Sequence, residues 1–374
     1  MSFPGLRPWM RRSIVDAMNG IFRTIIAASC GFGLAHVATA ATPPEQPLTG
    51  PGGREIAHAQ VIVHSYGSGS RAYWLFEPSQ PMPNEAPLIV FNHGWAAMDP
   101  GLYMAWIDHL VERGNIVVYP VYQDNLLTAA KDFTADAIVA VKDAIRRLQS
   151  EPGHVQPRLD RFAIVGHSMG GDVSANMAAL WHTEGLPFPR AVMCVEPGKS
   201  WGQPAWLDIE LADLSKVPAR TLLLTVAGDD DHIVRDIDAK RIFIESTQVP
   251  AANKDYITLV SDDHGRPALH ADHMAPLAWA QMPGMDHRAA SDSPGHKGGE
   301  RPPANHDMPD FTDTAESVNA LDYYGTWKLF DGLTDAAFFG TNRKYALGDT
   351  PEQRFMGVWS DGVPVKQLKV TDRP

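Results

Sequence analysis

The stretch that decides the fold is residues 161–180, which read RFAIVGHSMGGDVSANMAAL. Its first five residues form a mostly apolar run that is typical of a buried strand. The pattern G-x-S-x-G follows at 166–170, and a run rich in small residues comes next. A serine between glycines, at a turn from strand to helix, is the arrangement that holds a nucleophilic hydroxyl above a sheet. We therefore predict that Ser168 is a nucleophile at a helix N-terminus, where negative charge is stabilised.

Strand-like and helix-like segments alternate on both sides of this stretch. The strand-like runs are short and apolar, and they lie at 60–64, 72–76, 87–92, 115–121, 161–165, 190–195, 219–227 and 255–261. Helical periodicity is found at 102–113, 126–149, 169–183, 234–246 and 316–337. This alternation predicts an α/β fold with a mostly parallel eight-stranded sheet and helices on both faces. The first two strands are expected to form a hairpin, and the short segment between 195 and 219 excludes a large cap domain there.

The first forty residues differ in composition from the rest of the chain. Four arginines precede a small-residue, apolar run at 24–37, and Ala38-Thr39-Ala40 follows it. A basic segment, an apolar run and an A-x-A site define a secretory signal peptide, so we predict cleavage near Ala40 and a periplasmic or secreted protein. The apolar run is too short to span a membrane comfortably. Residues 41–55, rich in Pro and Gly, are expected to be a linker that leads into one domain at 56–374.

Charge and cysteine content exclude several classes of protein. The net charge is −12, and loss of the four arginines and one aspartate of residues 1–40 changes it to −15. No basic patch remains for nucleic acid, and no stable membrane insertion is expected after cleavage. Of the two cysteines, only Cys194 lies beyond residue 40, so an intrachain disulfide cannot form in the processed chain. A cysteine in an apolar strand is expected to be a packing residue.

A serine hydroxyl needs a base to accept its proton, and the base needs an acid to orient it. Asp231 follows the seventh predicted strand and is our candidate for the acid, whereas Asp229 and Asp230 are better explained as turn carboxylates. Two histidines follow the last predicted strand, His264 directly and His273 nine residues later. Distance from the strand favours His264, but a longer loop costs little closure entropy. Both histidines therefore remain candidates for the base.

Hydrolysis through a serine also requires two N–H groups that stabilise an oxyanion. Met169 follows the nucleophile, and Trp95 follows His93-Gly94 at the end of the third predicted strand. We expect the backbone N–H groups of Trp95 and Met169 to form this oxyanion hole, with His93 holding the loop. Glu196, at the end of the sixth predicted strand, is an alternative acid, although a loop-capping role explains it better.

Five segments resemble the α/β-hydrolase superfamily, and within it the dienelactone-hydrolase-like and cutinase-like polyester esterases. They are HGWAA at 93–97, GHSMGG at 166–171, AGDDDHIV at 227–234, ADHMAP at 271–276 and YYGTWKLF at 323–330. The resemblance covers about 86–275 and 316–337. It implies that Asp231 is the acid and that Trp95 and Met169 line the acyl site. His273 is favoured as the base, since ADHMAP resembles the Ala-Ser-His-Phe-Ala-Pro segment of cutinase-like esterases. It also suggests Trp201 as a wall of the substrate cleft.

The resemblance implies a serine hydrolase that cleaves small or polymeric carboxylic esters through an acyl-enzyme, without metal or organic cofactor. A peptidase or amidase uses the same triad and stays an alternative. A non-catalytic binding module is the alternative least consistent with the sequence, because such modules usually lack the nucleophile or the base and this chain has candidates for both. The insertion at 281–311 is rich in Pro, Gly, His, Met and Asp and is expected to be a flexible surface loop. Its His and Met residues lack the fixed spacing of a metal site.

Overall fold

The structure is a computed structural model that describes residues 40–198, 205–280 and 318–374. Residues 41–374 form one compact unit. Three predictions fall wholly or almost wholly outside the described residues: the signal peptide at 1–40, Trp201 as a cleft wall, and the insertion at 281–311. Within the described part of the chain, no helix combines the length and the apolar character that crossing a membrane would require.

The described strands form one sheet of nine, in the order β1-β2-β4-β3-β5-β6-β7-β8-β9. The five neighbouring pairs from β4 to β8 are parallel, whereas β1–β2, β2–β4 and β8–β9 are antiparallel. The strands are β1 Gln60–Tyr66, β2 Tyr73–Ser79, β3 Glu85–Asn92, β4 Ile116–Pro120, β5 Gln156–His167, β6 Pro189–Val195, β7 Leu222–Gly228, β8 Lys254–Leu259 and β9 Lys369–Thr371.

The predicted α/β architecture is confirmed, and with this strand order and its helices the chain has the α/β-hydrolase fold. The sheet is mostly parallel, as predicted, but the predicted number of eight strands is wrong, because the sheet also carries β9 at one edge. β9 has three residues and a single strongly apolar one, Val370, so its sequence has no periodicity to interpret. It exists because Val370 pairs with Ile257 of the neighbouring strand β8, which is a tertiary effect.

The helices connect the strands in the predicted alternation. The longer ones are α2 Met104–Glu112, α3 Phe133–Ser150, α4 Met169–Glu184, α5 Ile237–Glu245 and α7 Trp327–Phe339, with a short α8 at Pro351–Arg354. A π-helical segment, η7 Leu321–Thr326, leads into α7. Short 3-10 helices are η1 Gly69–Arg71, η2 Pro100–Tyr103, η3 Ala130–Asp132, η4 Ala205–Leu207, η5 Leu214–Lys216, η6 Ala251–Asn253 and η8 Arg343–Tyr345.

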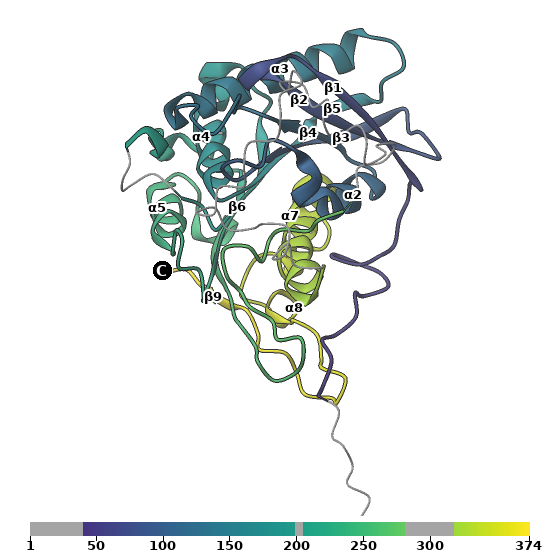
Figure 1. Cartoon of the computed structure of the whole chain (residues 1–374), viewed down its shortest axis with the longest axis vertical. Coiled ribbons are helices and arrows are strands. Elements are labelled where there is room, and N and C mark those ends of the chain that lie inside the picture. The colour runs from purple at the N-terminus through teal and green to yellow at the C-terminus, as the bar shows by residue number, and fades with distance from the viewer. Residues whose placement is uncertain (1–39, 199–204, 281–317) are drawn as a thin grey trace, which may run out of the picture. The chain divides into compact units, whose positions relative to one another are not determined.

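The two faces of the sheet are buried under different helices. Alternate residues of a strand point to opposite faces, so Ile89 and Phe91 of β3 join a cluster with α2 and α7. Leu88 and Val90, their neighbours on the same strand, join a cluster with α3 and α4. Figure 1 shows these two pairs of helices on opposite sides of the sheet. Burial on both faces fixes the central strands, whose carboxyl ends carry the residues discussed next.

Residues 41–55 contain no helix or strand and lie against the unit that they were expected to lead into. The Gly52 N–H donates a hydrogen bond of 2.8 Å to the Asp331 carboxylate of α7, which is 2% exposed. The same carboxylate is 2.8 Å from the ring of His109 in α2 and 3.3 Å from the guanidinium of Arg113. This segment therefore completes a buried polar network between α2 and α7.

Candidate active site

Ser168 occupies the turn between β5 and α4 in a backbone conformation that few non-glycine residues adopt. Its φ is 56° and its ψ is −130°. A Cβ atom on Gly166 would lie 2.1 Å from the carbonyl oxygen of Gly170, and one on Gly170 would lie 2.2 Å from the carbonyl oxygen of Asn92. Backbone atoms cannot move aside, so both glycines of the motif are required by packing. Strain of this kind persists at functional sites, where the surrounding structure holds it.

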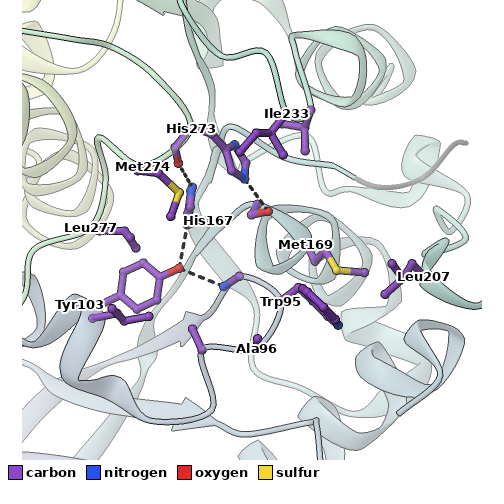
Figure 2. A pocket seen from close by; sticks show the side chains of 15 residues that line it. Trp95, Ala96, Tyr103, His167, Met169, Leu207, Ile233, His273, Met274 and Leu277 are labelled. Atoms are coloured by element: carbon purple, nitrogen blue, oxygen red, sulfur yellow. Dashed lines mark hydrogen bonds between the residues drawn. The ribbon is translucent and has the colours of Figure 1, made fainter. Parts of the chain in front are cut away.

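His273 lies between Ser168 and Asp231 and contacts both. Its Nε2 atom is 2.9 Å from Ser168 Oγ, and its Nδ1 atom is 2.8 Å from Asp231 Oδ2. Because an ionised carboxylate only accepts, Nδ1–H donates to Asp231, and Nε2 is left to accept the serine proton. Figure 2 shows the His273 ring directed at the hydroxyl from the edge of a pocket. The structure therefore brings these three predicted residues together in hydrogen-bonding order.

The environment of Asp231 keeps it ionised. Burial acts to raise its pKa, but the hydrogen bond and the charge of His273 act in the opposite direction. The backbone N–H groups of Ile233 and Val234 also donate to Asp231 Oδ1, at 2.8 and 3.0 Å. The net result is a pKa below the usual value for an aspartate. Asp231 can therefore orient His273 and stabilise its cation.

Glu196 lies behind the same histidine but forms no equivalent hydrogen bond. Its carboxylate is fully buried, 3.8 Å from His273 Nδ1, and neither oxygen has a hydrogen-bond partner within the described part of the chain. The predicted loop-capping role is therefore not seen among the described residues. Burial raises its pKa well above the usual range, and the charges of Asp231 and Asp272 add to this. A neutral Glu196 does not compete with Asp231 for the histidine.

The two predicted oxyanion donors, the N–H groups of Trp95 and Met169, belong to the loop after β3 and to the start of α4. Met169 is the first residue of α4, so its N–H has no acceptor within the helix. Trp95 stands between two anchored amides, because the Gly94 N–H donates to the Tyr103 hydroxyl at 3.0 Å and the Ala96 N–H donates to Gln123 Oε1 at 2.8 Å. These bonds fix the loop on either side of the Trp95 amide. Trp95 and Met169 both line the pocket beside Ser168.

The loop of His93 is also held by aromatic packing. The His93 ring nitrogens lie 2.6 and 2.7 Å from the carbonyl oxygens of Gly94 and Val121. The ring stacks on Tyr122 with a centroid separation of 4.1 Å. These contacts agree with the expectation that His93 holds the loop rather than acting as a base.

A buried hydrogen-bond chain links this loop to the segment that carries His273. His167 Nε2 is 2.9 Å from the His273 carbonyl oxygen, and its Nδ1 is 2.8 Å from the Tyr103 hydroxyl. Burial and, after it, the charge of His273 lower the pKa of His167 to about 3, so its ring is neutral. Nε2–H must then donate to the carbonyl, which leaves Nδ1 to accept from Tyr103. Tyr103 in turn accepts from the Gly94 N–H. Figure 2 draws this chain.

The candidate site opens onto an apolar pocket of about 200 Å³. Ser168 and His273 lie on its wall together with the chain segment 94–97. Most of the remaining lining is apolar, as Figure 2 shows, and includes Leu102, Leu207, Ile233, Met274 and Leu277. A pocket of this kind suits an apolar group attached to a reacting carbonyl.

The structure separates the two candidate histidines. His264 does not line the pocket, and its Nε2 atom is 2.7 Å from the carboxylate of Asp361 near the surface. Tyr103 and His167 lie in the site but were not predicted from the sequence. His167 could have been noticed, because it occupies the x position of G-x-S-x-G directly before Ser168. Tyr103 precedes an amphipathic helix, and nothing in its local sequence distinguishes it.

Comparison with known protein families gives a match over part of the chain. Residues 55–204 match the family model described as Chlorophyllase. The matched segment includes Trp95, Ser168 and Met169 but ends before Asp231 and His273. The family match supports the general class of ester hydrolases for this chain.

One solved structure to which the chain is similar is a mutant of the esterase rPPE. The similarity has a TM-score of 0.42 at 14% sequence identity, and it covers 55% of this chain and 74% of that chain. Among curated proteins, none matches this chain in sequence.

Proposed function

We propose that this protein is a serine hydrolase that cleaves carboxylic esters through an acyl-enzyme. The observation that carries the proposal is the continuous hydrogen-bond chain from Ser168 Oγ through His273 to Asp231, at the wall of an apolar pocket. A nucleophile, a base and an orienting acid in this order are what acyl transfer needs. The family match over residues 55–204 supports the same class of substrate.

In the proposed mechanism, Ser168 Oγ attacks the ester carbonyl while His273 Nε2 accepts its proton. The resulting oxyanion is stabilised by the N–H groups of Trp95 and Met169. The His273 cation then donates its proton to the leaving alcohol, and the acyl group remains on Ser168. Water then attacks the acyl carbonyl while His273 Nε2 accepts its proton. The second tetrahedral intermediate collapses by breaking the bond to Ser168 Oγ, which takes the proton back from His273 as the acid is released. Asp231 stays ionised and stabilises the cation, and its lowered pKa supports this role.

The pocket indicates the size of the acyl group. Its volume of about 200 Å³ is below the roughly 300–1,000 Å³ that is typical of sites for drug-sized ligands. The lining offers few hydrogen-bonding groups apart from the reacting ones. We therefore propose that short, apolar acyl groups react fastest.

The proposal is tested with a fluorophosphonate probe and a series of p-nitrophenyl esters from acetate to laurate. We expect stoichiometric labelling of Ser168, and a kcat/KM that is highest for short acyl chains. The matched p-nitroanilides report on amide cleavage and should react more slowly. Absence of both labelling and ester hydrolysis would contradict the proposal. Faster cleavage of the anilides would instead indicate an amidase.

Replacing Tyr103 by phenylalanine is expected to lower kcat about tenfold or more and to change KM little. The change removes the hydroxyl that joins Gly94 to His167, and an unpaired buried polar group costs about 1–3 kcal/mol. Both the Trp95 amide and His273 would then be less well positioned. Steady-state kinetics on a short ester measure the effect. The control is Tyr323→Phe, which loses a hydroxyl bond to the Pro44 carbonyl outside the pocket. A kcat within twofold of wild type for Tyr103→Phe would contradict the positioning role.

A further inference from the structure

A second cluster of chemically reactive side chains lies outside the pocket, on the hairpin that forms one edge of the sheet. It consists of His64 on β1, Glu77 on β2 and His154 in the connection between α3 and β5. The Glu77 side chain is 1% exposed and that of His154 6%, whereas that of His64 is 37% exposed. The cluster is therefore a buried carboxylate with one imidazole below the surface and one that faces solvent.

The hairpin register places the first two residues on one face. Ile62 pairs with Glu77 and His64 pairs with Leu75, so His64 and Glu77 are diagonal neighbours on the same side of the sheet. His64 Nε2 is 3.6 Å from Glu77 Oε2, and His154 Nδ1 is 2.7 Å from the same oxygen. One ligand atom from each of the three residues lies within 4.8 Å of the other two. Two imidazole nitrogens and a carboxylate oxygen thus converge on a single point.

Neighbouring groups hold two of the three side chains in this orientation. The Val155 N–H donates to Glu77 Oε1 at 2.7 Å, which leaves Oε2 directed at the histidines. The Tyr66 hydroxyl is 3.2 Å from His154 Nε2, the ring nitrogen that points away from the cluster. Metal-binding histidines are usually oriented by a partner on the second ring nitrogen. Tyr66 and Val155 supply this kind of support here.

We propose that His64, Glu77 and His154 form a binding site for a divalent transition-metal ion, of which Zn²⁺ is the best match. Two histidines and one glutamate with an open fourth position are an established ligand set for zinc. Zinc bonds of about 2.0–2.1 Å put neighbouring ligands of a tetrahedral site about 3.3 Å apart. The 3.6 Å separation of His64 and Glu77 is close to this value, and the 2.7 Å contact must lengthen by about 0.6 Å.

Binding requires a proton to move. His154 Nδ1–H donates to Glu77, so this nitrogen must lose its proton before it can bind zinc. If the His154 ring is neutral, its proton moves from Nδ1 to Nε2, and Nε2–H then donates a hydrogen bond to the Tyr66 oxygen. If the ring is cationic, Nδ1 releases its proton to solvent. No electron transfer or further reactant is involved.

The bound ion would connect parts of the chain that are distant in sequence. β1 is the edge strand, and among the described strands it pairs only with β2. Zinc would join this hairpin to the connection that precedes β5, the strand that ends directly before Ser168. We expect its effect on stability rather than on the chemical step, because none of the three ligands lines the pocket.

The test is zinc titration of the EDTA-treated full-length protein by isothermal calorimetry, together with thermal unfolding with and without ZnCl₂. The variants are His64→Ala, which removes the most exposed ligand, and Glu77→Gln, which keeps the shape and the bond to Val155. We expect wild type to bind one more zinc ion per chain than either variant. Zinc should raise its Tm by a few degrees, and this rise should be lost in both variants.

His182→Ala is the matched control, since it removes an exposed histidine from α4 and should leave both readouts unchanged. The histidines at 281–311, and His167 and His273, are present in every variant, so zinc bound there cancels in the comparison. Equal stoichiometry and an equal Tm shift in wild type and His64→Ala would overturn the proposal. So would the absence of any tight zinc site in the wild type.

Discussion

Replacing Ser168 by alanine is expected to lower kcat by a factor of about 10³ or more. The change removes only the hydroxyl, because alanine keeps the Cβ atom that the turn already accommodates at φ 56°. The bond to His273 Nε2 is lost, and among the described residues no other serine, threonine or cysteine lines the pocket. The fold should be unaffected, so the Tm is expected to stay close to that of wild type.

The measurement is turnover of a short p-nitrophenyl ester, together with labelling by the fluorophosphonate. Ser150→Ala, at the exposed end of α3, is the control and should keep full activity. If Ser168→Ala retained activity within tenfold of wild type, another group would have to be the nucleophile. The proposed mechanism would then be wrong.

Replacing His273 by alanine is expected to have an effect of similar size, whereas His264→Ala should change kcat by less than about threefold. Within the described ranges of the chain, His273 is the one side chain that hydrogen-bonds both the serine hydroxyl and the Asp231 carboxylate. His264 pairs with Asp361 near the surface, and exposed ion pairs of this kind contribute little to stability. Single-turnover kinetics on the same ester measure the loss. A dead His264→Ala enzyme with an active His273→Ala enzyme would reverse the assignment.

Local sequence was sufficient for the parts of the site that are formed locally. The turn around Ser168 is marked by two glycines within two positions of it, although the approach of the Asn92 carbonyl that requires Gly170 comes from a distant strand. Asp231 binds the N–H groups of Ile233 and Val234, which follow it directly. Such contacts leave a motif that can be identified without a structure.

The position of the histidine could not be derived in this way. Asp262 and Leu269 exchange two backbone hydrogen bonds of 2.8 Å, so the residues between them leave the last parallel strand and return to the same place. The Asp230 N–H then donates to the Ala271 carbonyl, which brings His273 to the end of β7. The distance from the strand end favoured His264, because that distance takes no account of the loop closed by Asp262 and Leu269. The resemblance to esterase segments indicated His273 without explaining its place.

Contacts between distant segments account for what the sequence did not indicate. Tyr103 meets His167 across 64 residues, and β9 pairs with a strand more than a hundred residues earlier. In both pairs, the sequence around one member contains no pattern from which the contact with the other could be predicted. The cluster of His64, Glu77 and His154 is of the same kind, because it depends on hairpin register and on a connection that folds back over the hairpin.

The packing of residues 41–55 determines where a shortened version of the protein can begin. Ala41 and Thr42 accept backbone hydrogen bonds from Arg266 and Ser360, and Gly52 supplies a donor to the Asp331 carboxylate. A truncation that begins at β1 would remove none of the described helices or strands. It would nevertheless strip one donor from a buried charge and uncover core surface beneath Ala41, which is 9% exposed. Deletion variants made for expression or crystallisation should therefore retain the chain from Ala41 onward.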